Sequence, residues 1–126
     1  YKNNSFDSII CMWSAFRELT NKSDQIKTIK EIKRVLKKNG NFLIEMTKPL
    51  KKSIKILKNK EIGDEVKIIK SGKIAIGKTA GIKSMPQYMH NKKTLSELMK
   101  KNKIKKYKIF IDNFGGRDRL FLQFWK

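Results

Sequence analysis

The sequence predicts an α/β fold whose sheet is mostly parallel, and three adjoining segments carry this prediction. Residues 6–13 and 42–46 are short apolar runs of the kind that form strands buried on both faces. Between them, apolar residues recur at a spacing of three and four over 23–38, which places them on one side of a helix. A strand, a helix and a second strand form the βαβ unit of a parallel sheet, whose crossover is almost always right-handed.

The first strand and the helix have clear limits in the sequence. Only Asp7 and Ser8 interrupt the apolar run of 6–13, so a strand that alternates between core and water is not expected. Asn21, ahead of the helix, can accept a hydrogen bond from a free N–H group of the first turn. Asn39-Gly40 is expected to close the helix, because both residue types tolerate a left-handed turn.

The middle of the chain predicts a short helix followed by a hairpin. Residues 48–59 carry apolar side chains at helical spacing, which fits a short helix after the second strand. Residues 65–69 (EVKII) and 73–76 (KIAI) are separated by Ser71-Gly72. This pattern predicts a hairpin that spans about 62–78.

The first three segments resemble the class I S-adenosylmethionine-dependent methyltransferases. In that family an FD-x-I strand precedes a helix that ends in R-V-L-K-x-x-G, and a hydrophobic strand follows. The matching residues here are 6–9 (FDSI), 34–40 (RVLKKNG) and 41–46 (NFLIEM). The family more often has Pro-Gly-Gly where this chain has Lys38-Asn39-Gly40, a mild departure because asparagine also tolerates a left-handed turn.

The resemblance extends over nearly the whole chain. Residues 91–98 (NKKTLSEL) resemble the family's T-x-x-E-L helix start, which implies a helix at about 92–102. Residues 107–112 and 120–125 resemble its last two strands. Residues 1–126 are therefore expected to form part of a Rossmann-like methyltransferase domain. The expected part is the C-terminal half of the sheet, mostly parallel, with a final antiparallel strand and an inserted hairpin. The hairpin would either cover the substrate pocket, as added strands often do in this family, or be a decoration.

The resemblance implies S-adenosylmethionine as the cofactor, although the motifs that hold most of it are missing. The family uses a glycine-rich loop after its first strand and an acidic residue at the end of its second, both upstream of the FD-x-I strand. Neither occurs in this sequence, in which no glycine follows a buried strand and opens a helix. We therefore expect the C-terminal half of an enzyme, inactive alone and poor at binding the cofactor.

Three residues are the expected cofactor contacts. Ligands of parallel α/β sheets bind outside the carboxyl ends of the strands. By resemblance, Cys11, Met12 and Trp13 lie there, beside the methionine portion of the cofactor. The aromatic face of Trp13 suits a cationic sulfonium. Ordinary packing under the following helix is the alternative for Trp13.

Four residues are the expected substrate contacts: Ser14, Phe16, Arg17 and Glu45. Ser14 and Arg17 can bond polar groups of an acceptor, and Phe16 either walls the pocket or packs in the core. Glu45 would orient or deprotonate the acceptor, because a carboxylate at a buried strand end is costly unless it is paired. No catalytic residue is assigned, and no cluster of metal ligands is predicted.

Three other residues invite a functional role, but a plainer one is favoured for each. His90 is the only histidine, and near a helix start it is expected to be partly solvated rather than a general base. Arg117 and Arg119 follow Gly115-Gly116 and are expected in a solvated turn rather than at the pocket.

The net charge of +20 is the electrostatic footprint of a nucleic-acid binder. However, four of the 31 basic residues are arginine and the other 27 are lysine, whereas specific phosphate and base contacts favour arginine. Most of the lysines are also spread along the chain, so a solvated surface is the favoured interpretation. An RNA methyltransferase and a non-enzymatic basic nucleic-acid-binding module remain the alternatives.

The predicted function is methyl transfer from S-adenosylmethionine to an unidentified acceptor. A small molecule is favoured as the acceptor, because no separate recognition domain is visible, and nucleic acid stays open as a partner. The single cysteine indicates no disulfide framework, and hence a cytoplasmic protein. No apolar stretch approaches ~18 residues, so no membrane span is expected. The oligomeric state is left open.

Overall fold

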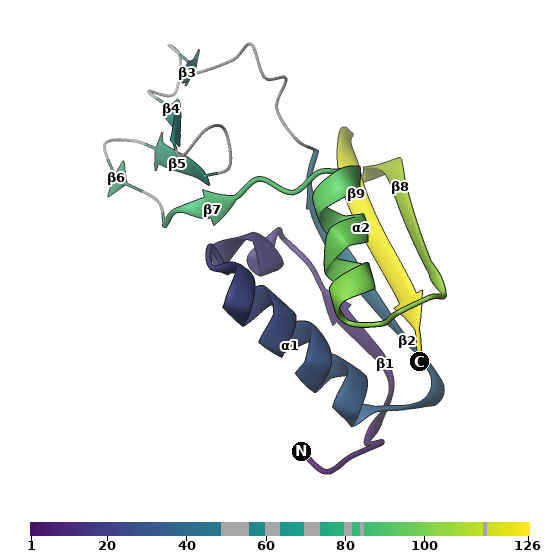
Figure 1. The fold of residues 1–126 in the computed structure, drawn as a ribbon. Coiled ribbons are helices and arrows are strands. Elements are labelled where there is room, and N and C mark those ends of the chain that lie inside the picture. Colours follow the sequence, from purple (N-terminus) through teal and green to yellow (C-terminus); the bar gives the residue numbers. More distant parts are fainter. Residues whose placement is uncertain (49–55, 60–63, 70–73, 80–81, 84, 115) are drawn as a thin grey trace.

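The computed structural model describes residues 1–48, 56–59, 64–69, 74–79, 82–83, 85–114 and 116–126. These residues form a four-stranded sheet with helices packed on it, and a smaller sheet beside it (Figure 1). The four-stranded sheet holds the core, and the smaller one is inserted in the middle of the chain.

The predicted βαβ unit is confirmed. It consists of β1 (Phe6–Cys11), α1 (Lys22–Val35) and β2 (Leu36–Thr47). The two strands are parallel neighbours in the sheet, with Ile9 beside Phe42. Their carboxyl ends therefore lie at the same end of the sheet.

The α1 helix begins as predicted but ends sooner. The Asn21 side chain accepts a hydrogen bond from the backbone N–H of Ser23 at 2.8 Å. Helical geometry stops before Leu36, which is fully buried and belongs to β2, so the prediction that Asn39-Gly40 closes the helix is wrong. The apolar side chain of Leu36 suits a helical stripe or a strand, and its pairing with Phe6 makes it a strand residue.

The start of β2 is irregular, and this irregularity explains Gly40. The pairing of β1 with β2 shifts register between Phe6 and Ser8, which leaves extra residues in β2. Asn39, one of these, has a left-handed φ of 66°. A Cβ on Gly40 would lie 2.9 Å from a carbonyl oxygen of its own strand and 3.0 Å from one in β1. Glycine is therefore required there by the close approach of backbone atoms.

The remaining strands of the main sheet give it the predicted mixed direction. β9 (Arg117–Trp125) lies antiparallel between β2 and β8 (Tyr107–Phe114), so the strand order is β1-β2-β9-β8. It follows that β1, β2 and β8 run in one direction and β9 runs in the other. The predicted mostly parallel sheet with a final antiparallel strand is confirmed.

The second helix, α2 (Lys92–Lys101), begins with a capping box. The Asn91 side chain accepts a hydrogen bond from the N–H of Thr94, and the Thr94 hydroxyl accepts one from the N–H of Asn91, both at 2.9 Å. Among the described residues, no helix is long and apolar enough to cross a membrane. Both helices lie on one face of the four-stranded sheet (Figure 1). The core between helices and sheet comprises Phe16, Ile29, Leu36, Phe42, Ile44, Met46, Leu95, Leu98, Met99, Ile104, Leu120, Leu122 and Phe124.

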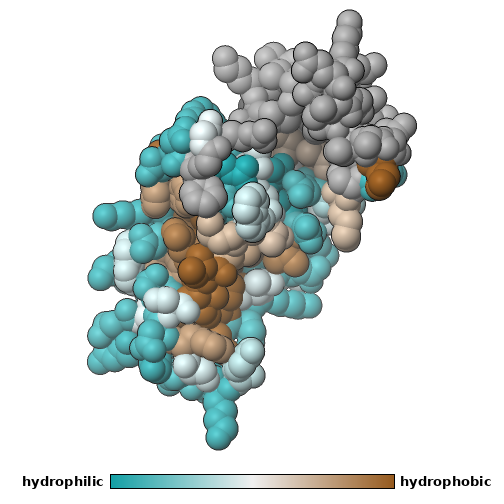
Figure 2. All heavy atoms as spheres, turned by 180° about the vertical axis from the view of Figure 1, so that it is seen from behind, coloured by the Kyte–Doolittle hydropathy of each residue, from teal (hydrophilic) through white to brown (hydrophobic). Residues whose placement is uncertain are grey.

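The opposite face of the four-stranded sheet presents apolar side chains to solvent. Figure 2, seen from behind, shows an apolar patch on this side of the molecule. Ile10 in β1 is 66% exposed there. On the same face, the rings of Phe110 and Phe121 stack on neighbouring strands with centroids 5.1 Å apart, where Phe110 is half-buried and Phe121 is buried. Neither described helix covers this face.

The smaller sheet contains the predicted hairpin. β4 (Asp64–Ile69) pairs antiparallel with β5 (Ile74–Thr79). The turn predicted at Ser71-Gly72 lies outside the described residues. β3 (Ile56–Asn59) pairs antiparallel with β4 on the other side.

The short helix predicted over 48–59 is wrong at its end, because the last four of those residues form β3 and pair with β4. The preceding 49–55 lie outside the described residues. After the hairpin, β6 (Ile82–Lys83) and β7 (Gln87–Tyr88) both pair with β5. The chain then returns through β7 to the main sheet and α2 (Figure 1).

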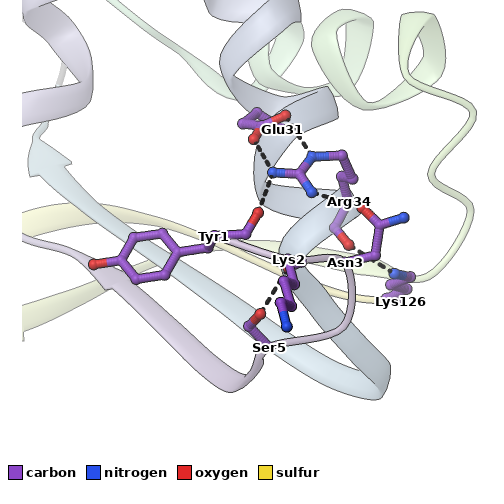
Figure 3. Close-up of polar contacts among 7 residues, drawn as sticks. All are labelled: Tyr1, Lys2, Asn3, Ser5, Glu31, Arg34 and Lys126. Carbon is purple, nitrogen blue, oxygen red and sulfur yellow. Dashed lines mark hydrogen bonds and ion pairs between the residues drawn. The ribbon is translucent and has the colours of Figure 1, made fainter.

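The first residues of the chain are tied to the end of α1 by Arg34 (Figure 3). Arg34 donates hydrogen bonds to Oδ1 of Asn3 at 2.6 Å and to the carbonyl oxygen of Tyr1 at 2.9 Å, and it forms an ion pair with Glu31. This exposed cluster lies at the amino end of β1. It is therefore at the opposite end of the sheet from the carboxyl ends of β1 and β2.

Candidate active site

Several segments converge at the carboxyl ends of β1 and β2. A short 3-10 helix, η1 (Ala15–Glu18), follows β1 there. β9 crosses the same end of the sheet, with Arg119 beside Thr47. β7 contacts η1. Ligands of parallel α/β sheets bind in this position.

The turn between β1 and η1 is strained, and β2 holds it in place. Trp13 and Ser14 both have left-handed φ values, 57° and 61°, a conformation that costs energy in residues other than glycine. The backbone N–H of Thr47 donates to the Ser14 hydroxyl at 2.8 Å, and the two hydroxyl oxygens lie 3.0 Å apart. The Trp13 side chain is 82% exposed.

Glu45 and Arg119 form an ion pair inside the protein. Glu45 is 1% exposed, and its Oε1 accepts a hydrogen bond from Nε of Arg119. Nη2 of Arg119 also donates to the Ser14 hydroxyl at 3.1 Å. Ser14, Glu45 and Arg119 are thus one network. The second carboxylate oxygen, Oε2 of Glu45, has no partner among the described residues.

The prediction of a solvated turn is wrong for Arg119, whose side chain is mostly buried. Side chains alternate along a strand, so Arg119 shares a face with Phe121, which is buried two residues later. A buried carboxylate also needs a cationic partner. The burial predicted for Glu45 was therefore the signal that could have found Arg119. The side chain of Arg117 lies outside the described part of the chain.

Arg17 in η1 is also buried, at 7% exposure, but it has few partners. Its Nε donates to the carbonyl oxygen of Tyr88 in β7 at 3.1 Å, which joins η1 to β7. Its terminal guanidinium nitrogens have no partner among the described residues. Burial, and then the nearby charge of Arg119, lower the pKa of Arg17.

His90 lies beside Arg17 and is 2% exposed, so the expectation that it is partly solvated is wrong. Its ring packs on Phe16 and Tyr88, with centroids 5.5 and 4.7 Å away. Nδ1 lies 3.4 Å from the Thr94 hydroxyl, and Nε2 has no partner among the described residues. Burial, and then the charge of Arg17, lower the pKa of His90 to about 3. The imidazole is therefore neutral near pH 7 and is a weak base.

The three expected cofactor contacts have different surroundings. Cys11 is half-buried against the core, and this burial raises the pKa of its thiol. Met12 is half-buried, and Trp13 is open to solvent. Of the expected substrate contacts, Phe16 belongs to the core and reaches the site as the wall behind His90. The contact of each with a ligand stays a prediction.

This arrangement can bind and orient polar groups. Within the described residues, a carboxylate oxygen of Glu45, the terminal nitrogens of Arg17 and a ring nitrogen of His90 have no partner and can bind a ligand. In the part of the chain that the structure describes, no group of three or more His, Cys, Asp and Glu residues is placed to hold a metal ion.

The fold matches solved structures of methyltransferases. An S-adenosylmethionine-dependent methyltransferase from Clostridium acetobutylicum has a TM-score of 0.66 and 13% identity, over 98% of this chain and 59% of its own. A methyltransferase from Methanosarcina mazei has a TM-score of 0.59 and 13% identity, over 100% of this chain and 61% of its own. A third structure is the 1,6-didemethyltoxoflavin-N1-methyltransferase of Burkholderia thailandensis, bound to 1,6-didemethyltoxoflavin and S-adenosylhomocysteine. It has a TM-score of 0.62 and 11% identity, over 100% of this chain and 46% of its own.

The sequence adds independent support. A family model described as a methyltransferase domain matches residues 1–44, from the start of the chain into β2. The chain has the fold of the class I S-adenosylmethionine-dependent methyltransferases. The resemblance stated from the sequence is thereby confirmed. No significantly similar relative is found among curated proteins. This methyltransferase-fold chain spans 46% to 61% of the length of the three solved structures.

Proposed function

We propose that the chain takes part in methyl transfer from S-adenosylmethionine to a small-molecule acceptor, as part of a longer protein. The observation that carries this proposal is that the methyltransferase-domain model matches residues 1–44, which lead into the candidate site. Residues 1–44 include the strand, turn and short helix that carry Trp13, the network residue Ser14 and the buried Arg17 to this end of the sheet. Free polar groups at the carboxyl ends of parallel strands are the expected equipment of a ligand site.

Trp13 and the two residues before it would form the cofactor side of the site. S-adenosylmethionine would supply an electrophilic methyl group on a cationic sulfonium. The exposed indole of Trp13 fits such a cation, because an aromatic face attracts positive charge. Cys11 and Met12 would line the same region at the end of β1.

Ser14, Phe16, Arg17 and Glu45 would form the acceptor side. Methyl transfer is a direct displacement at carbon, so the protein contributes mainly by aligning the nucleophile and excluding water. Arg119 holds one oxygen of Glu45, which leaves Oε2 free to accept a hydrogen bond from the acceptor. Glu45 would then take up the proton that the nucleophile loses as its new bond to the methyl carbon forms.

The Burkholderia structure, which holds a small-molecule acceptor, supports a small molecule here as well. RNA is the second candidate, favoured by one cluster of charge. Four lysines around Tyr107 line a shallow hollow of about 670 Å³ between α2 and the start of β8. They are Lys93, Lys100, Lys103 and Lys105. An RNA acceptor would make binding fall steeply as salt rises.

Calorimetric titration with S-adenosylmethionine tests the proposal. Residues 1–126 alone are expected to show no micromolar binding, because the family's glycine-rich loop is not in this sequence. The chain extended upstream in its reading frame is expected to bind, and Trp13→Ala is expected to weaken binding several-fold. Tyr1→Ala removes an aromatic side chain that is 93% exposed at the other end of β1, and it is the matched control. An extended chain that binds no cofactor would contradict the proposal and favour a non-enzymatic module.

A further inference from the structure

We propose that the methyl acceptor carries a carboxylate, bound by the two free terminal nitrogens of Arg17; this inference rests on the proposed function. A guanidinium group has five N–H donors. Arg17 is 7% exposed, yet among the described residues its one bond is to the carbonyl oxygen of Tyr88. The terminal nitrogens are not among the buried unpartnered atoms, so a ligand can approach them, and a cation that is largely withdrawn from water gains from a matched anion. A carboxylate can accept two parallel hydrogen bonds from the terminal nitrogens.

The charges around Arg17 leave room for one anion. Arg119 is close enough for its charge to lower the pKa of Arg17, and Arg119 is itself paired with Glu45. Glu18, the next residue in η1, is exposed; among the buried described charges, two guanidinium groups against one carboxylate leave one positive charge uncompensated. A single carboxylate balances that charge, whereas a phosphate monoester, with a charge of about −2 near pH 7, would exceed it.

Unpartnered buried atoms nearby indicate a ligand rather than a self-contained cluster. Nε2 of His90 and Oε2 of Glu45 have no partner among the described residues, although both side chains are more than nine-tenths buried. Buried polar atoms are seldom left in this state. His90 is close enough to Arg17 for that charge to lower its pKa, and Glu45 is joined to Arg119. Arg17 therefore has one unpartnered buried atom, Nε2 of His90, among its direct neighbours, and a second, Oε2 of Glu45, lies beyond Arg119.

A structural role is the alternative for Arg17. Its bond to Tyr88 joins η1 to β7, and that bond alone would explain why the side chain turns inward. Such a role uses Nε and makes no use of the terminal nitrogens. The two roles therefore differ in what happens to the guanidinium group when a carboxylate is added.

NMR of the arginine side chains in residues 1–126 tests the inference without methyl transfer. The four arginines give a simple set of Nε–H signals. Acetate is expected to shift the Arg17 signal saturably, and the neutral isostere acetamide is expected to leave it unchanged. No shift at Arg17, or an equal shift at the exposed Arg34, would overturn the inference. Tighter binding of methyl phosphate than of acetate would overturn the choice of carboxylate.

Two variants that each remove one positive charge distinguish acetate binding at Arg17 from acetate binding at exposed arginines. Arg17→Gln is expected to abolish the saturable acetate response, and Arg34→Gln is expected to keep it, because Arg34 lies at the other end of the sheet (Figure 3). Arg17→Lys keeps the charge without the planar fork and is expected to bind acetate about tenfold more weakly. Circular dichroism checks that each variant folds. If Arg17→Gln unfolds, the wild-type acetate titration still decides.

Steady-state kinetics of a longer protein that is active in methyl transfer give a second test, independent of acetate binding. Acceptors with a carboxylate are expected to react in preference to their amides. Arg17→Gln is expected to raise the acceptor KM about tenfold to a hundredfold and to leave the KM of S-adenosylmethionine unchanged. A preference for amides would contradict the carboxylate inference and leave the proposed function standing. Absent cofactor binding, with acetate binding intact, would contradict the proposed function while the anion site remained.

Discussion

Glu45 and Arg119 depend on each other because both are withdrawn from water. Replacing Arg119 with methionine leaves an uncompensated carboxylate that is 1% exposed. Arg119→Met is therefore expected to lower the free energy of unfolding by about 3 to 5 kcal/mol. The double variant Glu45→Gln and Arg119→Met removes the lone charge and is expected to recover part of this loss. Urea unfolding measures both changes.

An exposed ion pair between β9 and the residue that follows β2 provides the control. Lys48 and Asp118 lie 2.9 Å apart with both side chains about half exposed. Lys48→Met removes one positive charge, as Arg119→Met does. It is expected to change the free energy of unfolding little, because water screens the exposed pair. A double variant that is no more stable than Arg119→Met would show that the lone buried charge is not the cause of the loss.

His90 is expected to make stability depend on pH in acid solution. Its pKa is lowered from 6.5 to about 3 in the folded protein, so between these values the unfolded chain binds the extra proton. Stability is therefore complete above pH 6.5 and falls as the pH decreases toward 3. Arg17 and the Thr94 hydroxyl are the polar neighbours, and neither favours the imidazolium as a carboxylate would.

The variant His90→Gln isolates this effect from other acid-sensitive groups. From pH 6.5 to about 4.5, the wild type is expected to lose about 2 to 3 kcal/mol more than His90→Gln. Urea unfolding at several pH values measures the difference. Parallel pH profiles for the two proteins would mean that His90 is not held neutral in the folded state.

The environment of a single residue was predictable where its chemistry in a buried segment requires a partner. Glu45 was expected to need a partner because it lies at the end of a buried apolar strand, and the structure supplies one. Arg119 and His90 were misjudged because each was assessed from its local segment, next to a glycine pair or a helix start. Their burial comes from strands and helices far away in sequence, which local patterns do not report.

At the scale of single elements, the junction of α1 and β2 depends on Gly40. A Cβ there would lie 2.9 and 3.0 Å from two carbonyl oxygens of the backbone, which cannot move aside as a side chain can. Gly40→Ala is expected to lower the free energy of unfolding by about 1 to 3 kcal/mol. Thermal and urea unfolding measure the loss.

Gly116 is the matched control, because its backbone conformation, and not the space around it, favours glycine. It has a left-handed φ of 73° and nothing within 4 Å of an added Cβ. Gly116→Asn is expected to be nearly neutral, since asparagine tolerates this conformation, whereas Gly40→Asn is expected to destabilise at least as much as Gly40→Ala. If Gly40→Asn were tolerated, the close approach of backbone atoms would not be the reason for glycine.

The same junction shows where element prediction fails. Periodicity located the helix and both strands, because each buries one pattern of side chains. It placed the end of α1 too late, since Leu36 is apolar at a position that continues the helical stripe. The pairing of Leu36 with Phe6 is a contact between distant residues, and the sequence pattern holds no sign of it.

At the scale of the whole molecule, the helices cover one face of the sheet, and the other face is exposed only in part. The βαβ pattern predicted the order and direction of β1 and β2, and the resemblance predicted the antiparallel strand at the end. Buried runs such as 6–13 also indicated strands covered on both faces, and this prediction is wrong for β1, in which Ile10 is 66% exposed. In the structure, α1 and α2 lie on one side (Figure 1), while Ile10 and the stacked pair Phe110 and Phe121 lie on the other.

This exposed apolar face is expected to make residues 1–126 associate with one another. Large apolar patches associate in water, and the net charge of +20 opposes contact between copies. Salt screens that repulsion, so association is expected to grow as salt is raised. Ile10→Lys places a charge in the patch and is expected to reduce both association, measured by sedimentation velocity, and the binding of an apolar dye.

Ile111→Lys makes the same substitution at an exposed isoleucine on the other face of the sheet. Ile111 is 42% exposed in β8, one residue beyond Phe110, so its side chain points to the helix side. This variant adds the same charge and is expected to associate nearly as much as the wild type. If both variants reduced association equally, net charge rather than the exposed face would control it. A reduction by Ile10→Lys alone would locate the contact on the face that α1 and α2 leave open.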